Sequence, residues 1–408
     1  MNGFDRTPSS SLTRTALAEP WNRLTVTGLA QGAAAANPAR AFISDCPDRE
    51  AWEGNTPRRL SFGDFRRECE FFAGQIETLG LEPGNRALIL MPNIVEAAIA
   101  VVGCMTAGVT PALAPIEESV ETLRIAAERI GASAIITNAR CEDIRPAELA
   151  RQIAARVISI RCVAGFGHGL PEGVIPLDGW SEQDIDPNPN RPVRRQDQEG
   201  LVTFSFGVDG VVAHIRSEAQ AICDALAVAT RHKLARDCAL VNTMHQAGSA
   251  ALAASLLMPL FLGAQVRLVG PFKAERLRAA LRDTTQATLL CPASLVPLVR
   301  ESRGHEPALA ALGSILCVIR PGQEFEQAGD APPLSPLFDL LEQCLLAHSE
   351  LPETIDDILG PHVHPMDSVL EAGQPYLLLS RGDDDIIRAY GFAAAEAQAR
   401  SAAASEAA

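Results

Sequence analysis

The sequence predicts an α/β protein with two lobes, each built on a largely parallel sheet flanked by helices. Two observations predict this class. Runs with helical periodicity separate short apolar runs along most of the chain, and a polar stretch at 181–200 divides this pattern into two halves. Helices that alternate with short strands build βαβ units, in which the strands run parallel. The 408 residues suffice for two to three structural units, at roughly 150 residues per domain.

The first lobe is expected at 21–180, after a flexible arm at 1–20. Its predicted elements are a helix at 62–79, a strand at 87–91, a helix at 94–107, a strand at 109–112, a helix at 120–130 and a strand at 134–136. The helical runs repeat apolar residues with a 3.6-residue period, and the strands are short apolar runs. Pro83-Gly84 predicts a turn before the first of these strands, and Asn93 is expected to cap the helix after it.

The stretch 181–200 is the expected linker, because it holds three prolines and no apolar periodicity. The second lobe follows at 201–392, and an alanine-rich tail occupies 393–408. Predicted in the second lobe are a strand at 201–206, a helix at 217–230, a strand at 239–242, a helix at 249–262, a strand at 264–269 and a helix at 273–284. The uncharged stretch 247–266 contains small and polar residues, which favour a core helix turning into a strand over a membrane span.

Composition excludes several classes of function. Lys and Arg number 35 against 50 Asp and Glu, a net charge of −15, and the sequence has no basic run. Non-specific nucleic-acid binding and polybasic membrane docking are therefore not expected. The ten cysteines form no CxxC pair and lie mostly in apolar runs, as in the core of a protein from a reducing compartment. The first twenty residues do not resemble a secretory leader, so a cytoplasmic location is expected.

Several motifs in the first lobe follow one another in the same order as in a known enzyme family. They are Leu60-Ser61-Phe62-Gly63-Asp64-Phe65, Leu79-Gly80-Leu81-Glu82-Pro83-Gly84-Asn85-Arg86, Met91-Pro92-Asn93 with Glu96, and Ala107-Gly108-Val109-Thr110-Pro111. Together they resemble the amino-terminal part of adenylate-forming enzymes, which are acyl-CoA synthetases, adenylation domains of nonribosomal peptide synthetases, and luciferases. The resemblance continues at 242–248, 288–292 and 373–382, and so runs from about residue 24 to 392.

The resemblance implies a nucleotide-binding loop between 204 and 212. In the family a Ser/Thr/Gly-rich loop ending in Gly-x-Pro-Lys-Gly wraps the triphosphate with backbone N–H groups and a lysine. Here Ser205, Gly207 and Gly210 remain, Val208 and Asp209 replace the loop threonines, and the x-Pro-Lys-Gly stretch is deleted. Asp209 has the same sign of charge as phosphate, so weak triphosphate binding is expected. The alternative is that Gly207 and Gly210 only form a tight strand-to-helix turn.

Two further nucleotide contacts are implied. Glu350 matches the place of a family glutamate that helps to hold magnesium, and its alternative is a solvated glutamate at the end of an element. Gly322 is the matching residue in the family's segment beside the adenine. The family's Thr-Gly-Asp ribose motif and its carboxy-terminal lid with a catalytic lysine have no counterpart, so the domain is expected to stop after Tyr390.

On the acyl side, the resemblance points to His245 and Gly248 in Asn242-Thr243-Met244-His245-Gln246-Ala247-Gly248. The implied role of His245 is to line the acyl pocket near the carboxylate, and the alternative is a core histidine. No metal site is expected. His362 and His364 share one side of an extended segment, but no third ligand lies near them in the sequence.

The sequence thus predicts a non-catalytic or strongly impaired homologue of acyl-CoA synthetases that binds a carboxylate or acyl ligand, or a protein partner, and no cofactor is assigned to it. The rival hypothesis is a working carboxylate–CoA ligase or adenylating enzyme that uses ATP, magnesium and CoA. In this enzyme a non-standard phosphate loop of unusual residues, or another polypeptide, takes the place of the lost loop and lid. A third is a structural subunit with a filled pocket. Without a lid the cleft face needs cover, which favours a homodimer or a hetero-complex.

Overall fold

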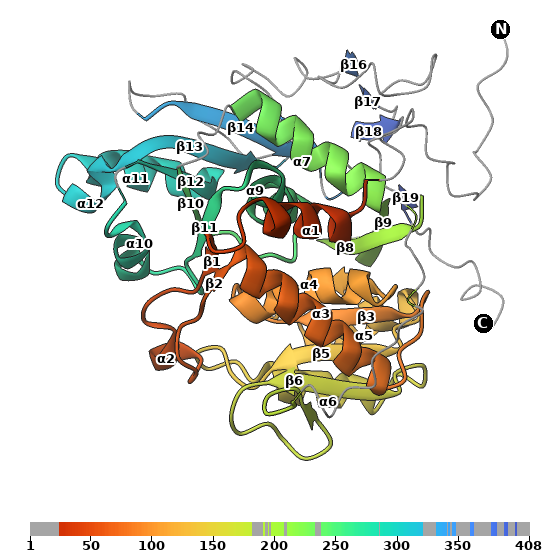
Figure 1. Ribbon diagram of the computed structural model, residues 1–408. Helices are drawn as coiled ribbons and strands as arrows, with labels where there is room; N and C mark the ends of the chain where they lie inside the picture. The colour runs from red at the N-terminus through yellow and green to blue at the C-terminus, as the bar shows by residue number, and fades with distance from the viewer. Residues whose placement is uncertain are drawn as a thin grey trace, which may run out of the picture.

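The computed structural model describes residues 24–181, 191, 195, 197–207, 210–232, 238–284, 286–320, 332–340, 342 and 345–347, and the backbone of four short strands between 360 and 397. It confirms the predicted α/β class. Two eight-stranded, largely parallel sheets are covered by helices, and Figure 1 shows the second sheet (teal and blue) above the first (orange and yellow).

The first sheet has the strand order β19-β9-β8-β4-β3-β5-β6-β7. Its strands are β3 (Arg86–Leu90), β4 (Thr110–Leu113), β5 (Ala134–Asn138), β6 (Cys162–Phe166), β7 (Ile175–Pro176), β8 (Glu199–Gly207), β9 (Gly210–Ser217) and β19 (Glu396–Ala397). From β8 to β7 all neighbours are parallel, whereas β9 is antiparallel to both β8 and β19. Its helices are α3 (Phe62–Thr78), α4 (Val95–Thr106), α5 (Val120–Arg129) and α6 (Pro146–Ala154).

The second sheet has the order β15-β14-β13-β12-β10-β11-β1-β2 and is parallel except at its two edges. Its strands are β1 (Ala41–Ser44), β2 (Arg59–Ser61), β10 (Ala239–Asn242), β11 (Gln265–Leu268), β12 (Ala287–Pro292), β13 (Leu312–Ile319), β14 (Leu334–Asp339) and β15 (Leu345–Ala347). A separate antiparallel sheet contains β16 (Gly360–His362), β17 (Leu377–Arg381) and β18 (Ile387–Tyr390).

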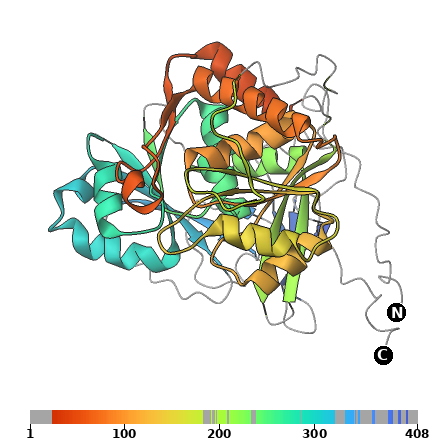
Figure 2. The same cartoon turned by 90° about the horizontal axis from the view of Figure 1, so that it is seen from below.

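The remaining helical segments are α1 (Val26–Ala36), α2 (Arg49–Trp52), α7 (Glu218–His232), α8 (Ser249–Leu252), the π-helix η3 (Ala253–Leu257), α9 (Met258–Leu262), α10 (Ala274–Leu281), the 3-10 turn η4 (Ala293–Leu295), α11 (Val296–Arg303) and α12 (Pro307–Ala310). Helix α1 packs against α3, α4 and α9, and α7 contacts strands of both sheets. Seen from below, the helices that follow β11 (teal) lie on one side of the molecule and those of the first sheet on the other (Figure 2). No helix in the described part of the chain has the length and apolar character to cross a bilayer.

Sheet membership crosses the predicted 181–200 boundary in both directions. Strands β1 and β2 precede this boundary yet lie at the edge of the second sheet, and β8 and β9 follow it yet belong to the first. One hydrophobic cluster accordingly contains Leu88 of the first sheet together with Ile43 and Leu240 of the second. The two sheets therefore share a core, and residues of both sheets line a cavity between them.

The first turns of α3 and α4 are capped in two different ways, one by a neighbouring residue and one by a residue far away in the chain. Ser61 and Asp64 form a capping box on α3, with hydrogen bonds of 3.1 and 3.3 Å between each side chain and the other residue's backbone N–H. The expectation that Asn93 caps the next helix is wrong. Asp45 accepts the hydrogen bond from the N–H of Val95 at 2.9 Å, and the Asn93 amide instead donates to the carbonyl of Asn242. A partner 50 residues away in the chain replaces the local cap.

Helices α3 and α4 meet at Gly103, which gives the first prediction. A Cβ atom on Gly103 would lie 2.5 Å from Cδ1 of the buried Phe72 ring and 3.1 Å from the carbonyl oxygen of Cys69. We expect Gly103→Ala to lower the free energy of unfolding by about 1–3 kcal/mol, because overpacking moves the helices apart. Urea titration measures this. In the control Gly32→Ala on α1, nothing lies within 4 Å of the new Cβ, so stability should rise by about 0.5–1 kcal/mol; equal effects of the two substitutions would contradict the packing argument.

Candidate functional site

A cavity of about 370 Å³ lies where β8 of the first sheet faces the carboxyl ends of the second-sheet strands. Its lining consists of Pro115, Glu118, Phe204, Ser205, Phe206, Met244, His245, Ala247, Gly248, Ala250, Ala251, Pro292, Val318, Arg320, Asp339 and Glu342. The residues of the second sheet lie at or after the ends of β10, β12, β13 and β14. In open α/β sheets this edge is where ligands bind.

Three of the predicted site residues meet in this cavity. Ser205, His245 and Gly248 all line it, although 40 residues separate the first two in the chain. Gly207 and Gly210 lie at the end of the β8–β9 hairpin and are not part of the lining. Gly322 and Glu350 lie outside the described residues, as does Asp209.

His245 contributes a neutral imidazole. Its Nδ1 accepts a hydrogen bond from the N–H of Ala247 at 3.0 Å, so the proton of the neutral ring is on Nε2. Burial lowers the pKa of His245 and keeps the ring uncharged. Among the described residues Nε2 has no hydrogen-bond acceptor. Nε2 is buried, and the backbone carbonyl of Met91 faces the ring, so His245 lines the cavity as a fixed and uncharged wall.

Ser205 is held by a histidine on the neighbouring strand. Its Oγ lies 2.9 Å from Nε2 of His214, across the β8–β9 pair. Burial, together with nearby Arg216, lowers the pKa of His214 to about 4. Its Nδ1 has no hydrogen-bond partner among the described residues, so no carboxylate orients the ring as in a catalytic triad. The pair fixes the Ser205 hydroxyl group at the cavity wall.

Glu342 is the main acidic group of the cavity, and the sequence analysis did not identify it. Its Oε2 accepts a hydrogen bond from the N–H of Ser249 at 2.8 Å, and its Oε1 lies 3.4 Å from Nη2 of Arg320. A Cβ atom on Gly248 would come within 3.1 Å of Glu342 Oε1, so this glycine leaves room for the carboxylate. Burial, followed by the charge of Asp339, raises the pKa of Glu342 to about 7.

A buried charge network supports Glu342 from behind. Arg216 donates from Nη1 to the backbone carbonyl of Glu342 at 2.9 Å, and its Nε lies 3.3 Å from Asp224 Oδ2. Asp339 accepts a hydrogen bond from the N–H of Glu342 at 2.9 Å and another from Nε of Arg320 at 3.0 Å. Four segments of the chain thus fix the geometry of one carboxylate.

A short sequence pattern indicates the position of Asp339 and Glu342. Asp339 and Glu342 follow directly after the apolar strand 334–338, and parallel strands carry functional side chains at their carboxyl ends. The family resemblance implies Glu350 as the magnesium-holding glutamate, eight residues further along, and Glu350 lies outside the described residues. The carboxylate that the structure brings into the cavity is that of Glu342.

The β8–β9 hairpin is closed tightly. The two strands pair up to Gly207 opposite Gly210, so two residues connect them, and Gly210 has a φ of +92°. Glycine adopts this left-handed conformation at little cost. The expected strand-to-helix turn at these glycines is wrong, because strand β9 follows Gly210 and α7 begins only at Glu218.

Comparison with known proteins gives the family. A family model described as AMP-binding enzyme matches residues 34–324, well over half of the chain. The chain belongs to the AMP-binding enzyme family. It is 26% identical over 173 residues to salicyl-AMP ligase / salicyl-S-ArCP synthetase from Mycobacterium tuberculosis, a match that covers 42% of this chain and 29% of the relative. The resemblance to adenylate-forming enzymes is thereby confirmed.

Solved structures of this family share the fold. MbtA from Mycobacterium smegmatis in its apo form aligns with a TM-score of 0.68 at 18% identity, over 92% of this chain and 68% of that one. The N-terminal domain of FACL13 from M. tuberculosis aligns at 0.67 and 13%, over 92% of both chains. Acetoacetyl-CoA synthetase from Streptomyces lividans aligns at 0.61 and 14%, over 79% of this chain and 53% of that one. Identities this low show the architecture alone.

The described cavity of this family member does not fit magnesium triphosphate. Its one described arginine, Arg320, already contacts both Asp339 and Glu342, and no lysine lines the cavity. The sequence contains two lysines. Lys273 pairs with Glu142 at 2.7 Å, and Lys233 lies outside the described residues. No group of three or more metal-ligating side chains occurs among the residues that the structure describes. His362 lies in β16, for which only the backbone is described, and His364 lies outside the described residues.

Proposed function

We propose that this AMP-binding family member binds a small carboxylic acid or acyl group in the cavity and has lost tight binding of MgATP. The observation that carries the proposal is the β8–β9 hairpin, in which Gly207 pairs directly with Gly210. A two-residue connection offers too few backbone N–H groups to surround three phosphates. The one described arginine of the lining, Arg320, is already paired with Asp339 and Glu342, so it does not balance the phosphate charge.

The acyl half of the cavity supports the other part of the proposal. Phe204, Phe206, Met244 and Val318 give it apolar walls. The uncharged imidazole of His245 and a protonated Glu342 both line the cavity, and neither repels the carboxylate of such a ligand. The names of salicyl-AMP ligase and acetoacetyl-CoA synthetase refer to acyl groups of this size class, which supports a small acid as the ligand.

The nucleotide half is tested by calorimetry with MgATP and by ATP–pyrophosphate exchange over a panel of carboxylic acids. We expect no exchange above background and a dissociation constant above about 1 mM. Each lost charge-assisted contact is worth about 1.5–3 kcal/mol, or roughly ten- to a hundredfold in affinity. Micromolar binding of MgATP, or exchange with any acid, would instead establish the active ligase. If exchange required a second polypeptide, the ligase would be one completed by another chain.

The acyl half is tested by thermal shift with the same acids. We expect stabilisation by at least one small aromatic or branched acid, and its loss in His245→Ala, because the variant removes the imidazole wall of the cavity. His305→Ala is the matched control, since this histidine lies in the turn before α12, outside the cavity lining. An acid whose effect is equal in the wild type and in a folded His245→Ala variant would contradict the role of His245. The expected homodimer or hetero-complex stays a prediction.

A further inference from the structure

A second cavity shares no lining residue with the first and lies in a part of the molecule that the proposed function does not use. It has a volume of about 730 Å³ and is bounded by α3, α4, the segment after β6 and β7, and the loop before β2. Its lining consists of Asn55, Thr56, Arg58, Arg67, Glu68, Phe71, Phe72, Gln75, Glu96, Ile99, Phe166, His168, Leu177, Asp178, Gly179, Trp180 and Ser181.

The apolar wall of this cavity is aromatic. Phe71, Phe72, Phe166 and Trp180 all line it, in a sequence of which aromatic residues make up only 5%. Phe72 and Phe166 stack with their ring centroids 6.0 Å apart. The Trp180 Nε1–H donates to the carbonyl oxygen of Pro176 at 2.8 Å, so the indole is held in place and its polar group is already satisfied. What the ring can still offer a ligand is its face, and aromatic faces attract cations.

The polar wall has an excess of negative charge. Its described charged side chains are three carboxylates and two guanidinium groups. Arg67 is paired with Asp64, a carboxylate outside the lining, so its charge is already balanced. Arg58 lies between two acids, 2.8 Å from Glu68 and 3.3 Å from Glu96. The cavity thus has no spare positive charge for an anionic ligand.

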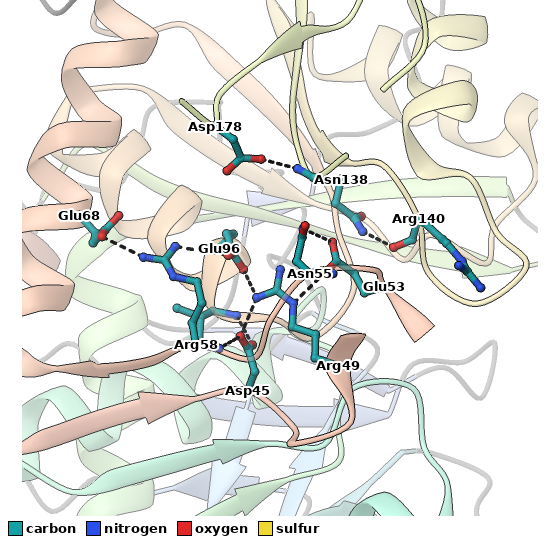
Figure 3. A network of polar contacts seen from close by, with 12 residues as sticks. Asp45, Arg49, Glu53, Asn55, Arg58, Glu68, Glu96, Asn138, Arg140 and Asp178 are labelled. Atoms are coloured by element: carbon teal, nitrogen blue, oxygen red, sulfur yellow. Dashed lines mark hydrogen bonds and ion pairs between the residues drawn. The ribbon is translucent and has the colours of Figure 1, made fainter. Parts of the chain in front are cut away.

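Glu96 is the innermost of these carboxylates. It is 5% exposed and forms the floor of the cavity between Arg58 and the fully buried Arg49 (Figure 3). Its Oε2 lies 2.8 Å from Nη1 of Arg49 and its Oε1 lies 3.3 Å from Nη1 of Arg58, so both oxygens already face guanidinium groups. Of the carboxylates in the lining, the one left for a ligand is therefore Asp178, at the exposed edge of the cavity.

Asp178 is the carboxylate of the lining that has no ion-pair partner among the described residues. Its Oδ2 accepts a hydrogen bond from the N–H of Gly167 at 2.5 Å, and it forms no ion pair with any residue in the described part of the chain. It stands two residues before Trp180, on the same loop. A carboxylate without a cationic partner therefore lies beside a fixed indole at the edge of an aromatic cavity.

We propose that this second cavity binds a small organic cation, an amine carried on an apolar or aromatic body. The ammonium group lies against Asp178 and the face of Trp180, and the apolar body lies against Phe71 and Phe166. Cation–π attraction and a charge-assisted hydrogen bond both favour the ammonium over a neutral group of the same shape. The excess negative charge excludes a carboxylate, so the two cavities take ligands of opposite charge.

The test compares three probes of one shape by calorimetry: phenethylammonium, 2-phenylethanol and phenylacetate. We expect the amine to bind at least about tenfold more tightly than the alcohol, and phenylacetate not to compete with it. Asp178→Asn should weaken the amine by about tenfold and leave the alcohol unchanged. The asparagine keeps an oxygen that can accept from Gly167, so the loop is retained. Trp180→Leu should weaken the amine as well.

Two carboxylates serve as matched controls. Glu172→Gln removes a charge from the exposed loop between β6 and β7, outside the lining, and Glu118→Gln removes one from the first cavity. Both should leave the affinity for the amine unchanged. The proposal is overturned if the amine does not bind by about 10 mM or binds no more tightly than the alcohol. It is also overturned if Asp178→Asn has no effect, or if Glu118→Gln has the larger one.

Discussion

Arg49→Met is expected to lower the free energy of unfolding by about 3–5 kcal/mol. The Arg49 side chain is completely buried and contacts three carboxylates, as Figure 3 shows. Its Nη1 lies 2.6 Å from Asp45 Oδ2 and 2.8 Å from Glu96 Oε2, and its Nε lies 3.0 Å from Glu53 Oε2. Methionine fills much of the same volume, but it leaves these acids buried without their shared cation.

The loss of stability in Arg49→Met should depend on pH, because the acids that it leaves without a cation can take up protons. Burial already raises the pKa of Asp45 to about 6 although Arg49 opposes this, so removing Arg49 raises that pKa further. At pH 5 the acids of the variant escape the cost of burial by taking up protons. At pH 8 they cannot. The loss of stability in Arg49→Met should therefore be larger at pH 8 than at pH 5.

Urea titration of wild type and variant at both pH values checks this prediction. Arg124→Met is the matched control, because Arg124 also joins two acids, Glu121 and Glu128, but on the outer face of helix α5. Exposed ion pairs contribute little, so the control should leave the stability close to that of the wild type. If Arg49→Met cost no more than this control, the network would have to be read as packing alone.

The sequence was sufficient for most elements of the fold because their patterns are local. The helical period at 62–79 and the short apolar runs at 87–91 and 134–136 predicted α3, β3 and β5 closely. Sheet membership was not predictable in this way. Nothing in the alternation of 41–61 indicates that β1 pairs with β11, about 220 residues later, and joins β2 to the second sheet instead of the first.

Strand β9 was missed for a related reason. Gly207 and Gly210 indicate a tight turn, but a turn alone does not say whether a strand or a helix follows. The apolar residues Val211, Val212 and Ile215 could have decided this, since a run of β-branched residues favours a strand. The hairpin that they form is the observation on which the proposed loss of MgATP binding rests.

The candidate site was predicted in part. His245 and Gly248 are neighbours in the chain, and the family motif linked both to a pocket. Glu342 was overlooked because its partners are remote: Ser249 precedes it by 93 residues and Arg216 by 126. A buried carboxylate is defined by such contacts, and they exist only in the folded chain.

Glu342→Gln is the second substitution with a large expected effect, and here the effect is a gain at high pH. Burial raises the pKa of Glu342 from 4.5 to about 7. Between these values the folded protein holds a proton that the unfolded chain has released, so stability falls as the pH rises through this window. Above pH 7 the cost of the buried charge is fully present. Glutamine removes that cost and keeps an oxygen that can accept from the N–H of Ser249.

Other buried groups titrate in the same range, which makes the comparison with wild type necessary. Burial raises the pKa of Asp224 to about 7, whereas it lowers the pKa of His232 to about 4. The first group makes stability fall with rising pH and the second makes it rise between pH 4 and 6.5, so the two partly cancel. Both are present in wild type and variant alike, and the difference between the two proteins isolates Glu342.

We therefore expect Glu342→Gln to gain about 2 kcal/mol relative to wild type between pH 5 and pH 8, measured by urea unfolding at each pH. The control Glu148→Gln removes an exposed acid that pairs with Arg151 on α6, and its difference from wild type should stay constant within about 0.5 kcal/mol. A pH-independent difference for Glu342→Gln would mean that Glu342 is already ionised at pH 5. In that case a small acid in the cavity would meet two negative charges instead of one, and binding of the carboxylate beside His245 would lose its physical basis.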